Sequence, residues 1–416
     1  MRRPTAIDLF AGTGGLSAGL ISAGYEVIFA NEVEEAFAQT LKGNHPSTEI
    51  SVQDIREIDP AGIRRGMALE KGELDLLAGG PPCQGFSINA PIRSVEDERN
   101  HLFLEYLKFV NEFRPKVAVI ENVPGMVSFE KGKTIRDIFL ALEELGYTVG
   151  VRIVFMPHYG IPQMRWRTVF IATTQPIQPE SLFPVPTHFA SGRPNFGTKF
   201  AGNQLTLDLD YVKQVANYSN HTTIDEAIGD LPPIDNGGGE LIQPYTQQPT
   251  SEYQTQMRRD SNELTNHICA GLGPSNTARL EHIPPGGSWR DIPFDLLPEG
   301  MKRARRSDHT KRYGRLHPDG IASTILTKCD PHWGSYIHPD QDRVLSVREA
   351  ARLQAFPDHY RFYGSLAEQY KQVGNAVPPM FAEQLGARVL AQLSGHAEEL
   401  PTIGEGVQQN LALVGA

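Results

Sequence analysis

Short apolar runs alternate with segments of helical periodicity through the first 150 residues, and this alternation constrains the fold more than any other feature of the chain. The runs at 6–10, 25–30, 74–78 and 117–120 have the length of buried strands. Residues 102–113 carry apolar side chains at helical spacing, and a proline ends that helix soon afterwards. Strands that alternate with helices favour parallel pairing through crossover helices. We therefore predict a doubly wound α/β domain.

The composition and periodicity of the sequence change at about residue 174. Prolines, glycines, asparagines and glutamines multiply from there to about residue 323, and periodicity is weak. Regular periodicity returns in a helix whose start carries a capping box of Ser346 and Glu349, and a last helix opens at the 372–379 segment and runs to about Leu393. We interpret the irregular part as a second, loop-rich domain inserted into the first. The predicted boundaries are 1–175 for the first part of the α/β domain, 176–322 for the insertion, 323–395 for the return to the α/β domain and 396–416 for a flexible tail.

Cysteine usage and hydropathy exclude several classes of protein. The three cysteines among the 416 residues, Cys83, Cys269 and Cys329, are far apart and form no Cys/His cluster, so we expect reduced thiols and no bound metal. No apolar run approaches the ~20 residues needed to cross a bilayer. The first residues lead straight into a predicted strand, so we expect no signal peptide. We expect a cytoplasmic protein.

One stretch is strongly basic, although the chain as a whole has a net charge of −10. Residues 299–315 contain seven cations and two anions, a local net charge of +5. Such a patch can bind phosphates without the whole chain being positive. Taken alone, it is more readily explained as a solvated face.

A glycine-rich turn, 11–15, follows the first predicted strand and opens a helix at about Leu16. Backbone N–H groups at such a helix start are free to bind a ligand. The glycine spacing departs from the dinucleotide fingerprint, so a nicotinamide cofactor is not favoured. Glu32, at the end of the second strand, is placed to accept hydrogen bonds from a ribose. Its other explanation, which is compatible with the first, is a carboxylate that complements a helix dipole.

The stretch Gly79-Gly80-Pro81-Pro82-Cys83-Gln84-Gly85-Phe86-Ser87 follows another apolar strand. The glycines let the backbone turn, and the prolines stiffen it. A thiol at the carboxyl end of a strand lies where open α/β sheets keep their ligands, although a lone cysteine is more often simply buried. A carboxylate, Glu121, directly follows the predicted strand at 117–120, so it too lies at the carboxyl end of a strand. The polar segment 87–100 has the length of a mobile lid.

Six blocks occur in one order and together resemble the DNA (cytosine-5) methyltransferase family. The blocks are Asp8-Leu9-Phe10-Ala11-Gly12-Thr13-Gly14-Gly15, Pro81-Pro82-Cys83-Gln84, Glu121-Asn122-Val123, Gln163-x-Arg165-x-Arg167, Arg348-Glu349-Ala350-Ala351-Arg352-Leu353-Gln354 and Gln372-Val373-Gly374-Asn375. One short motif recurs by chance, whereas six in the family's order are specific. The resemblance covers about residues 5–175 and 320–393, and it implies the Rossmann-like fold of S-adenosylmethionine-dependent methyltransferases.

The resemblance implies covalent catalysis. Carbon 5 of cytosine does not take a methyl group unaided, and attack of a thiolate on carbon 6 turns the ring into an enamine-like nucleophile. Cys83 would supply the thiolate, and Glu121 would contact ring nitrogen 3 and the exocyclic amine. Arg167 would hold oxygen 2 of the base, and Arg165 would support the cysteine or a phosphate.

The methyl donor implied by the resemblance is S-adenosylmethionine. In the family the glycine-rich block cradles its methionine end, the acid after the second strand takes the ribose, and further residues frame the adenine or return against the glycine loop. The corresponding cofactor-binding residues here are Phe10, Ala11, Gly12, Gly14, Gly15, Leu16, Glu32, Asp54, Ile55, Pro81, Leu102, Asn375 and Ala376.

The substrate implied by the resemblance is a cytosine flipped out of double-stranded DNA, with 87–100 as the closing lid. The inserted domain lies where the family places its target-recognition domain, and its loops at Trp289 and 330–334 are candidates for reading bases. The residues expected to contact DNA are Ser87, Gln163, Lys302, Arg303, Arg305, Arg306, Arg312 and Arg315. No recognition code links these residues to a target sequence.

Two other functions stay open on the sequence. The first is a cytosine-5 methyltransferase that acts on transfer RNA, and the second is a catalytically silent DNA-binding relative. The residues after Cys83 and the long insertion favour DNA, while the presence of both Cys83 and Glu121 disfavours the silent relative. A compact chain of this type is typical of a bacterial modification enzyme, in some cases paired with a restriction endonuclease. One active site per chain is compatible with a monomer.

Overall fold

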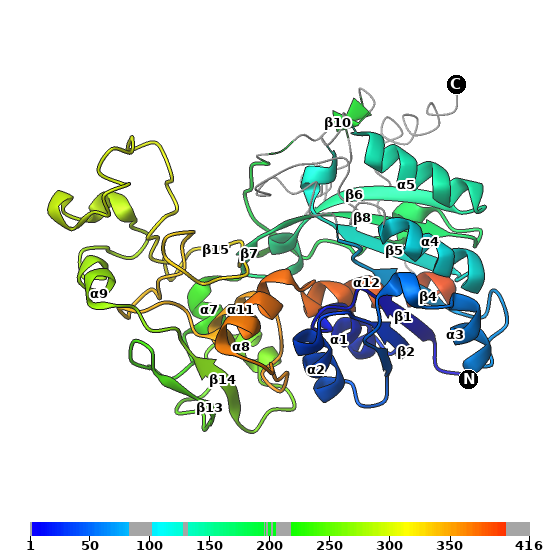
Figure 1. The fold of residues 1–416 in the computed structure, drawn as a ribbon, viewed down its shortest axis with the longest axis horizontal. Coiled ribbons are helices and arrows are strands. Elements are labelled where there is room, and N and C mark those ends of the chain that lie inside the picture. Colours follow the sequence, from blue (N-terminus) through cyan, green and yellow to red (C-terminus); the bar gives the residue numbers. More distant parts are fainter. Residues whose placement is uncertain are drawn as a thin grey trace. The chain divides into compact units, whose positions relative to one another are not determined.

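The computed structural model describes residues 2–82, 102–127, 132–194, 196, 199–200, 203–204 and 218–396. The chain divides into two compact units (Figure 1). Unit 1 comprises Met1–Tyr159, Trp166–Asn220 and Pro379–Ala416, and unit 2 comprises Gly160–Arg165 and His221–Pro378.

Unit 1 is built on a seven-stranded sheet with the strand order β3-β2-β1-β4-β5-β8-β6. The first five strands in this order pair in parallel, and β8 is antiparallel to both of its neighbours. The order reverses direction at β1, as in doubly wound sheets, so the predicted α/β fold is confirmed. The strands are β1 (Thr5–Leu9), β2 (Glu26–Asn31), β3 (Glu49–Ser51), β4 (Leu76–Gly79), β5 (Val117–Asn122), β6 (Thr148–Phe155) and β8 (Trp166–Thr173).

Helices pack on the sheet in two groups. Helix α4 contacts α3 and α5, and together with the strands these helices enclose the large apolar core, whereas α1 packs along α12. A Cβ on Gly19 of α1 would lie 2.2 Å from the carbonyl oxygen of Pro379, so the α1–α12 contact needs glycine at that position. The helices of unit 1 are α1 (Gly15–Ser22), α2 (Glu35–Asn44), α3 (Pro60–Gly66), α4 (Leu102–Phe113), α5 (Lys133–Glu144) and α12 (Pro379–Leu393).

Unit 2 consists of short elements joined by loops (Figure 1). Its strands form two small pairs, β13 with β14 and β15 with β7, and a compact apolar cluster surrounds Trp289. The elements are β7 (Gln163–Met164), α7 (Ile224–Ile228), β13 (Gly239–Gln243), α8 (Glu252–Met257), β14 (Leu264–Ile268), α9 (Pro274–Leu280), β15 (Ala322–Ser323), α10 (Val347–Leu353) and α11 (Leu366–Asn375).

Buried ion pairs attach α10 to the rest of unit 2. The predicted capping box is present, with the Ser346 hydroxyl accepting from the N–H of Glu349. The carboxylate of Glu349 also pairs with Arg343 at 2.7 Å, and Arg352 pairs with Asp230 and Asp358 at the same distance. The helix therefore folds with residues 221–345 rather than with the sheet.

The two units differ from the predicted domain boundaries at both ends of the insertion. Residues 323–378, expected to return to the α/β domain, belong to unit 2 because of the ion pairs of α10. Residues 176–220, expected in the insertion, belong to unit 1. There the Phe183 ring lies under the Arg152 guanidinium at 4.4 Å, and the carbonyl of Ser181 accepts from Arg388.

Several elements differ from their predicted extents. The fifth strand continues two residues further than expected and includes Glu121. The 372–375 segment ends a helix, α11, that the sequence analysis did not predict, and the last helix begins at Pro379 and ends at Leu393 as expected. The described residues contain no helix that is both long and apolar enough to span a membrane.

Candidate active site at the carboxyl edge of the sheet

The parallel register brings three loops of unit 1 together at one edge of the sheet. Leu9, the last residue of β1, lies opposite Gly79 of β4, and Gly79 lies opposite Ile120 of β5. The residues that follow each position are therefore neighbours at the carboxyl ends of the strands, where doubly wound sheets bind ligands. These residues are the glycine-rich turn after Leu9, the Gly80-Pro81 turn and Glu121.

Glu121 and Arg167 form an ion pair at this edge. Residue 121 lies on β5, and β8 runs antiparallel beside it with Val169 opposite Glu121. The Nε atom of Arg167 lies 2.5 Å from Oε1 of Glu121, and each side chain is only 13% exposed. This ion pair is largely buried, and charges interact more strongly there than in water. The pair therefore orients both side chains.

Asn122 fixes the turn that leads toward residue 83. Its side-chain amide donates a 2.9 Å hydrogen bond to the carbonyl oxygen of Pro81, and its side-chain oxygen accepts from the N–H of Val123. The sequence analysis included Asn122 in a motif but gave it no role. Its position directly after a carboxylate at a strand end was the only signal of this function.

Close packing explains the two glycines before the prolines. Both keep negative φ angles among the described residues, so the predicted need for a permissive turn is not the reason for them. A Cβ on Gly79 would lie 2.7 Å from the carbonyl oxygen of Leu9 and 3.1 Å from the Tyr106 ring. A Cβ on Gly80 would lie 3.4 Å from Oε2 of Glu121. The glycines thus let the turn pass close to β1, α4 and the carboxylate.

Several predicted residues lie outside the described part of the chain. These are Cys83, Ser87, the expected lid at 87–100 and all of the expected tail after His396. The described segment ends at Pro82, which immediately precedes Cys83 in the sequence. The roles of these residues stay predictions.

The glycine-rich turn after β1 has an unusual backbone. Phe10, Gly12 and Gly14 all adopt left-handed φ angles, 57°, 58° and 90°, and Gly14 caps α1. The N–H of Gly12 donates to Oε2 of Glu32 at 2.8 Å, and the other oxygen of Glu32 accepts from the N–H of Glu34 at 2.7 Å. Glu32 therefore ties the turn to the end of β2, which places both predicted cofactor groups side by side.

The turn is open on one side. A Cβ on Gly12 would meet no atom within 4 Å, so the backbone there borders free space among the described residues. Ala11, Gly14, Gly15 and Leu16 are buried, and Phe10 and Leu102 are partly buried against the main core. This open cradle of glycine backbone has the character of a site for the polar end of a small cofactor.

The pair expected to frame the adenine occupies one short turn. Asp54 accepts from the N–H of Arg56 and forms an ion pair with its guanidinium at 2.6 Å, and the hydrogen bonds from Arg56, followed by its charge, lower the pKa of Asp54. Ile55 is buried, and Pro81 is buried at the Gly80-Pro81 turn. Asp54 thus keeps an ionised, partly exposed carboxylate at the start of the turn.

Arg165 and Gln163 lie in unit 2, where they hydrogen-bond to other parts of that unit. The Arg165 guanidinium is 1% exposed and donates to the carbonyl oxygens of Gly374 and Ala376 at 3.0 and 3.1 Å. The Gln163 amide is buried, donates to the carbonyl of Leu353 and accepts from the N–H of Ile325. These contacts of both side chains are with backbone groups at 325, 353, 374 and 376, and their predicted roles at the cysteine and on DNA stay predictions.

Asn375 and Ala376 end α11. The side chain of Asn375 is exposed, and the carbonyl of Ala376 accepts from both Arg165 and the Gln354 amide. A Cβ on Gly374 would lie 2.3 Å from the carbonyl oxygen of Leu326, which explains the glycine in that block. Their contact with a cofactor stays a prediction.

The basic stretch divides into exposed and buried cations. Arg303, Arg305, Arg306 and Lys311 are exposed, and Lys302 pairs with Glu299. Arg315 differs from the expectation of a DNA contact. Its guanidinium is buried and donates to the carbonyls of Leu280, Ile283, His338 and Gln341, and it pairs with Asp342. We assign Arg315 to the folding of unit 2.

The two tryptophan loops also differ in the exposure of their side chains. Trp289 is 4% exposed, lies in the core of unit 2 and donates its indole N–H to the carbonyl of Asp308. Trp333 is 64% exposed, with the Arg312 guanidinium 5.9 Å from its ring. Of these two candidate loops, only 330–334 exposes its tryptophan side chain.

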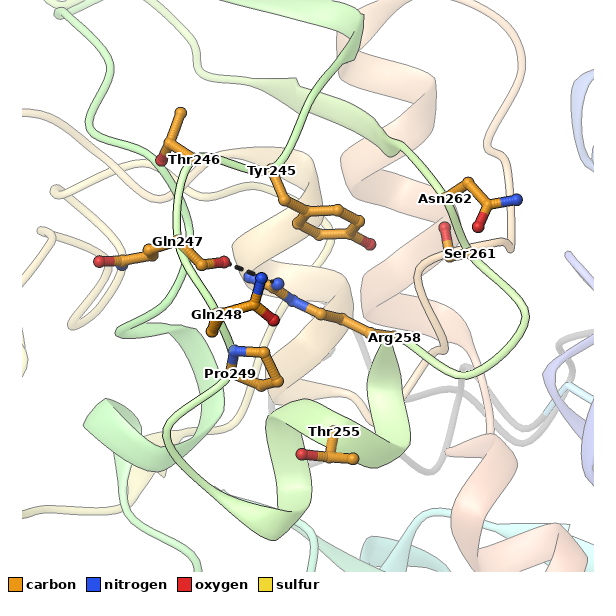
Figure 2. A pocket seen from close by; sticks show the side chains of 9 residues that line it. All are labelled: Tyr245, Thr246, Gln247, Gln248, Pro249, Thr255, Arg258, Ser261 and Asn262. Atoms are coloured by element: carbon orange, nitrogen blue, oxygen red, sulfur yellow. Dashed lines mark hydrogen bonds between the residues drawn. The ribbon is translucent and has the colours of Figure 1, made fainter.

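A polar pocket of about 540 Å³ lies in unit 2 beside α8 (Figure 2). Its charged side chain, Arg258, stacks on Tyr245 at 3.9 Å and pairs with Asp230 at 2.5 Å. The Tyr245 hydroxyl donates to Asp358. Because these groups interact with one another, the pocket has the character of a structural cluster with an exposed rim. The lining residues are Tyr245, Thr246, Gln247, Gln248, Pro249, Thr255, Arg258, Ser261 and Asn262.

The described residues contain no cluster of His, Cys, Asp and Glu suited to a metal ion. The groups that the structure brings together at the candidate site are the ion pair of Glu121 and Arg167, the Pro81 turn and the glycine cradle.

Comparison with known proteins places this arrangement in a family. A family model described as C-5 cytosine-specific DNA methylase matches residues 5–391. The chain is 33% identical over 445 residues to the Type II methyltransferase M.AgeI of Thalassovita gelatinovora, which covers 93% of this chain and 99% of that protein. It is 31% identical over 471 residues to DNA (cytosine-5)-methyltransferase 1 of Mus musculus, which covers 94% of this chain and 28% of that protein.

The fold is similar to that of a prophage-encoded E. coli protein described as a DNA modification methyltransferase. The TM-score is 0.69 at 23% identity, over 94% of this chain and 99% of the other. Because the family model spans almost the whole chain and the Type II relative aligns over nearly its full length, the chain belongs to the C-5 cytosine-specific DNA methylases and is a DNA (cytosine-5)-methyltransferase.

Proposed function

We propose that this enzyme methylates carbon 5 of cytosine within a specific sequence of double-stranded DNA, through a covalent adduct of Cys83 with a flipped-out base. The observation that carries the proposal is the placement of Glu121. Its carboxylate pairs with Arg167 at 2.5 Å and borders Gly80, three residues before Cys83. Asn122 anchors the same turn through Pro81.

In the proposed reaction the Cys83 thiolate attacks carbon 6 of the cytosine. The electron pair of the carbon 5–carbon 6 double bond moves toward carbon 5, and negative charge develops on the ring. Glu121 in its acid form donates its proton to ring nitrogen 3, which neutralises this charge, and its other oxygen accepts from the exocyclic amine. We propose that Arg167, which pairs with Glu121, donates to oxygen 2 of the base.

S-adenosylmethionine supplies an electrophilic methyl group when it is bound. The described residues fit this donor in two respects. The turn at Phe10–Gly15 is open beside Gly12, and Glu32 ends the neighbouring strand with its carboxylate on that turn. We propose that the turn holds the methionine end and that Glu32 and Asp54 orient the ribose and the adenine. After methylation, a base removes the proton of carbon 5, and elimination frees Cys83.

We propose that unit 2 contains the residues that read the target sequence. Arg303, Arg305, Arg306 and Lys311 are exposed and suited to phosphate contacts, and the 330–334 loop presents Trp333. The Type II relative supports a bacterial modification enzyme whose methylation protects DNA against a partner endonuclease.

Trapping the adduct tests the mechanism. Duplex DNA containing 5-fluorocytosine has no carbon 5 proton to remove, so the enzyme and S-adenosylmethionine are expected to give an adduct that survives denaturation. Cys83→Ser is expected to give none. Cys269→Ser is the matched control, because serine can keep the contacts of Cys269 with Gly237 and Asp235. Equal trapping by Cys83→Ser would exclude the proposed nucleophile.

Mapping of 5-methylcytosine by bisulfite sequencing identifies the substrate. Unmethylated genomic DNA incubated with the enzyme is expected to become methylated at one sequence motif. A parallel incubation with transfer RNA tests the alternative substrate. Methylation of the RNA and none of the DNA would favour the RNA enzyme, and methylation of neither would favour a silent relative.

A further inference from the structure

Asp8 lies beneath the glycine-rich turn and is not explained by the proposed reaction. Along β1, Ile7 and Leu9 belong to the main apolar core, so the alternation of a strand turns Asp8 toward the opposite face. There its Oδ2 accepts a 2.6 Å hydrogen bond from the hydroxyl of Ser17 on α1. Asp8 precedes the turn in the sequence and Ser17 follows it, so their hydrogen bond links the two ends of the turn.

The carboxyl group of Asp8 is buried without a counter-charge among the described residues. It is 1% exposed, and its Oδ1 has no hydrogen-bond partner among them. A buried carboxylate that accepts only from Ser17 among the described residues, with no cation beside it, is unfavourable compared with its neutral acid. Burial raises the pKa of Asp8 to about 7, hydrogen bonds from Ser17 oppose the shift, and the negative charge of Glu32 adds to it.

None of the groups near Asp8 among the described residues fully offsets the free-energy cost of ionising its carboxyl group. From α1 the contact is the Ser17 hydroxyl, which is not ionised in this range. From the end of β2 the nearby charge is Glu32, which is negative. Across the sheet, in the main core, Tyr106 of α4 interacts electrostatically with Asp8, and its buried hydroxyl hydrogen-bonds the carbonyls of Leu77 and Val119. A positive charge brought to the turn would be the first to favour the ionised form.

We propose that Asp8 is a positioning residue that couples binding of the methyl donor to release of a proton. The inference rests on the proposed function, since it takes S-adenosylmethionine as the ligand of the Phe10–Gly15 turn. The donor carries a positively charged sulfonium, which stabilises the Asp8 carboxylate relative to the acid. The acid proton leaves to the solvent, and no other bond changes. S-adenosylhomocysteine has a neutral sulfur and lacks this effect.

The proposal fixes the sign of a pH dependence. Because the donor binds the deprotonated form more tightly, its affinity rises with pH through about 7. The gain approaches about tenfold for each unit by which the bound cation lowers the pKa. Affinity for S-adenosylhomocysteine changes less over the same range. The coupling therefore favours exchange of the spent product for fresh donor at neutral and higher pH.

Calorimetry measures the proton directly. The heat of binding of S-adenosylmethionine is recorded at pH 7 in buffers with different enthalpies of ionisation, and its slope gives the protons released. At a pKa of about 7 the wild type is expected to release up to roughly half a proton more than Asp8→Asn. The donor has a titratable amino group of its own, and the difference between wild type and variant removes that contribution. S-adenosylhomocysteine is expected to show little difference between the two proteins.

Ser17→Ala provides a second variant that keeps the carboxyl group. Loss of the Ser17 donor disfavours the carboxylate, so proton release is expected to move to higher pH. This shift tests the proposal even if Asp8→Asn does not fold. Normal binding with the same proton release in the wild type and both variants would overturn this inference alone. Failure of the wild type to bind S-adenosylmethionine would overturn the proposed function as well.

Discussion

The Nε atom of Arg167 lies 2.5 Å from the carboxylate of Glu121, across the antiparallel pair of β8 and β5. Each residue holds the other at the edge of the sheet where we propose that cytosine binds. Removing Arg167 leaves the carboxylate largely buried and without this partner. The pair is therefore expected to act as one unit in catalysis.

Arg167→Ala is expected to lower the single-turnover rate of methylation by about a hundredfold to a thousandfold, because it removes a preorganised donor and releases Glu121. The affinity for S-adenosylmethionine is expected to change little. Arg361→Ala, which breaks an exposed pair with Glu263, is the control. A loss of donor affinity that matches the loss of rate would show that Arg167 acts through folding.

Asn122→Ala is expected to slow trapping of 5-fluorocytosine DNA by about tenfold or more, because the carbonyl of Pro81 loses its donor and the turn before Cys83 loosens. Asn122→Asp keeps the side-chain acceptor for Val123 but cannot donate to Pro81. Both variants are therefore expected to be slow. A normal trapping rate in Asn122→Asp would show that the bond to Pro81 does not position the cysteine.

Local patterns in the sequence were sufficient to predict part of this structure. The capping box of Ser346 and Glu349 and the helix Leu102–Phe113 were predicted correctly, because each depends on residues a few positions apart. The edge of the sheet that carries Glu121 was predicted from strand alternation. Asn122 could not be assigned, because its partner Pro81 is 41 residues away in the sequence.

Buried charges account for most of the remaining differences. Arg352 and Arg348 have the spacing of ordinary helix residues, yet both are fully buried, with partners at Asp230 and Thr265. Arg315 sits in a basic stretch and is nevertheless a buried cross-link. A charged side chain is expected to be exposed when only the sequence is known. These arginines are buried because the fold brings hydrogen-bond and ion-pair partners to them from distant parts of the sequence. This explains why the domain boundary at residue 323 was misplaced.

Gly19→Ala is expected to destabilise the protein by about 1–3 kcal/mol or more, because the new Cβ would overlap the backbone of Pro379 on α12. Gly66→Ala is the matched control. It lies at the exposed end of α3, and a Cβ there meets no atom within 4 Å. The control is expected to be neutral or stabilising by about 0.4–1 kcal/mol. Urea unfolding of both variants checks the difference, and equal stabilities would contradict the tight α1–α12 contact.

Acid is expected to destabilise unit 2 through its buried carboxylates. Burial by itself would raise the pKa of Glu349, but the charges of Arg343 and His338 and the hydrogen bonds from Arg343 hold it well below its usual range. The pKa of Asp358 is likewise lowered by Arg352 against the effect of burial. Groups with a lowered pKa in the folded state stabilise it at neutral pH, and this stability is lost as pH falls below about 4.

Glu349→Gln tests that linkage. The variant is expected to be less stable than the wild type at pH 7 by about 3–5 kcal/mol, because Arg343 loses its buried partner. The difference is expected to shrink toward pH 3, because the Glu349 carboxyl of the unfolded wild type is protonated there while that of the folded state stays ionised. Glu263→Gln, at an exposed pair, is the control. Urea unfolding from pH 7 to 3 measures the effect, and a constant difference across that range would contradict it.

The exposed and buried cations of the basic stretch are expected to respond differently to mutation. Replacing Arg303 and Arg305 by glutamine removes two exposed charges, so DNA affinity is expected to fall and the slope of log affinity against log salt to decrease by about two. Arg315→Gln is expected instead to lower the stability of unit 2, because buried carbonyls lose their donor. Fluorescence anisotropy with a DNA duplex between 50 and 200 mM salt, beside urea unfolding, separates the two effects. An unchanged salt slope in the Arg303/Arg305 variant would remove this surface from the proposed DNA interface.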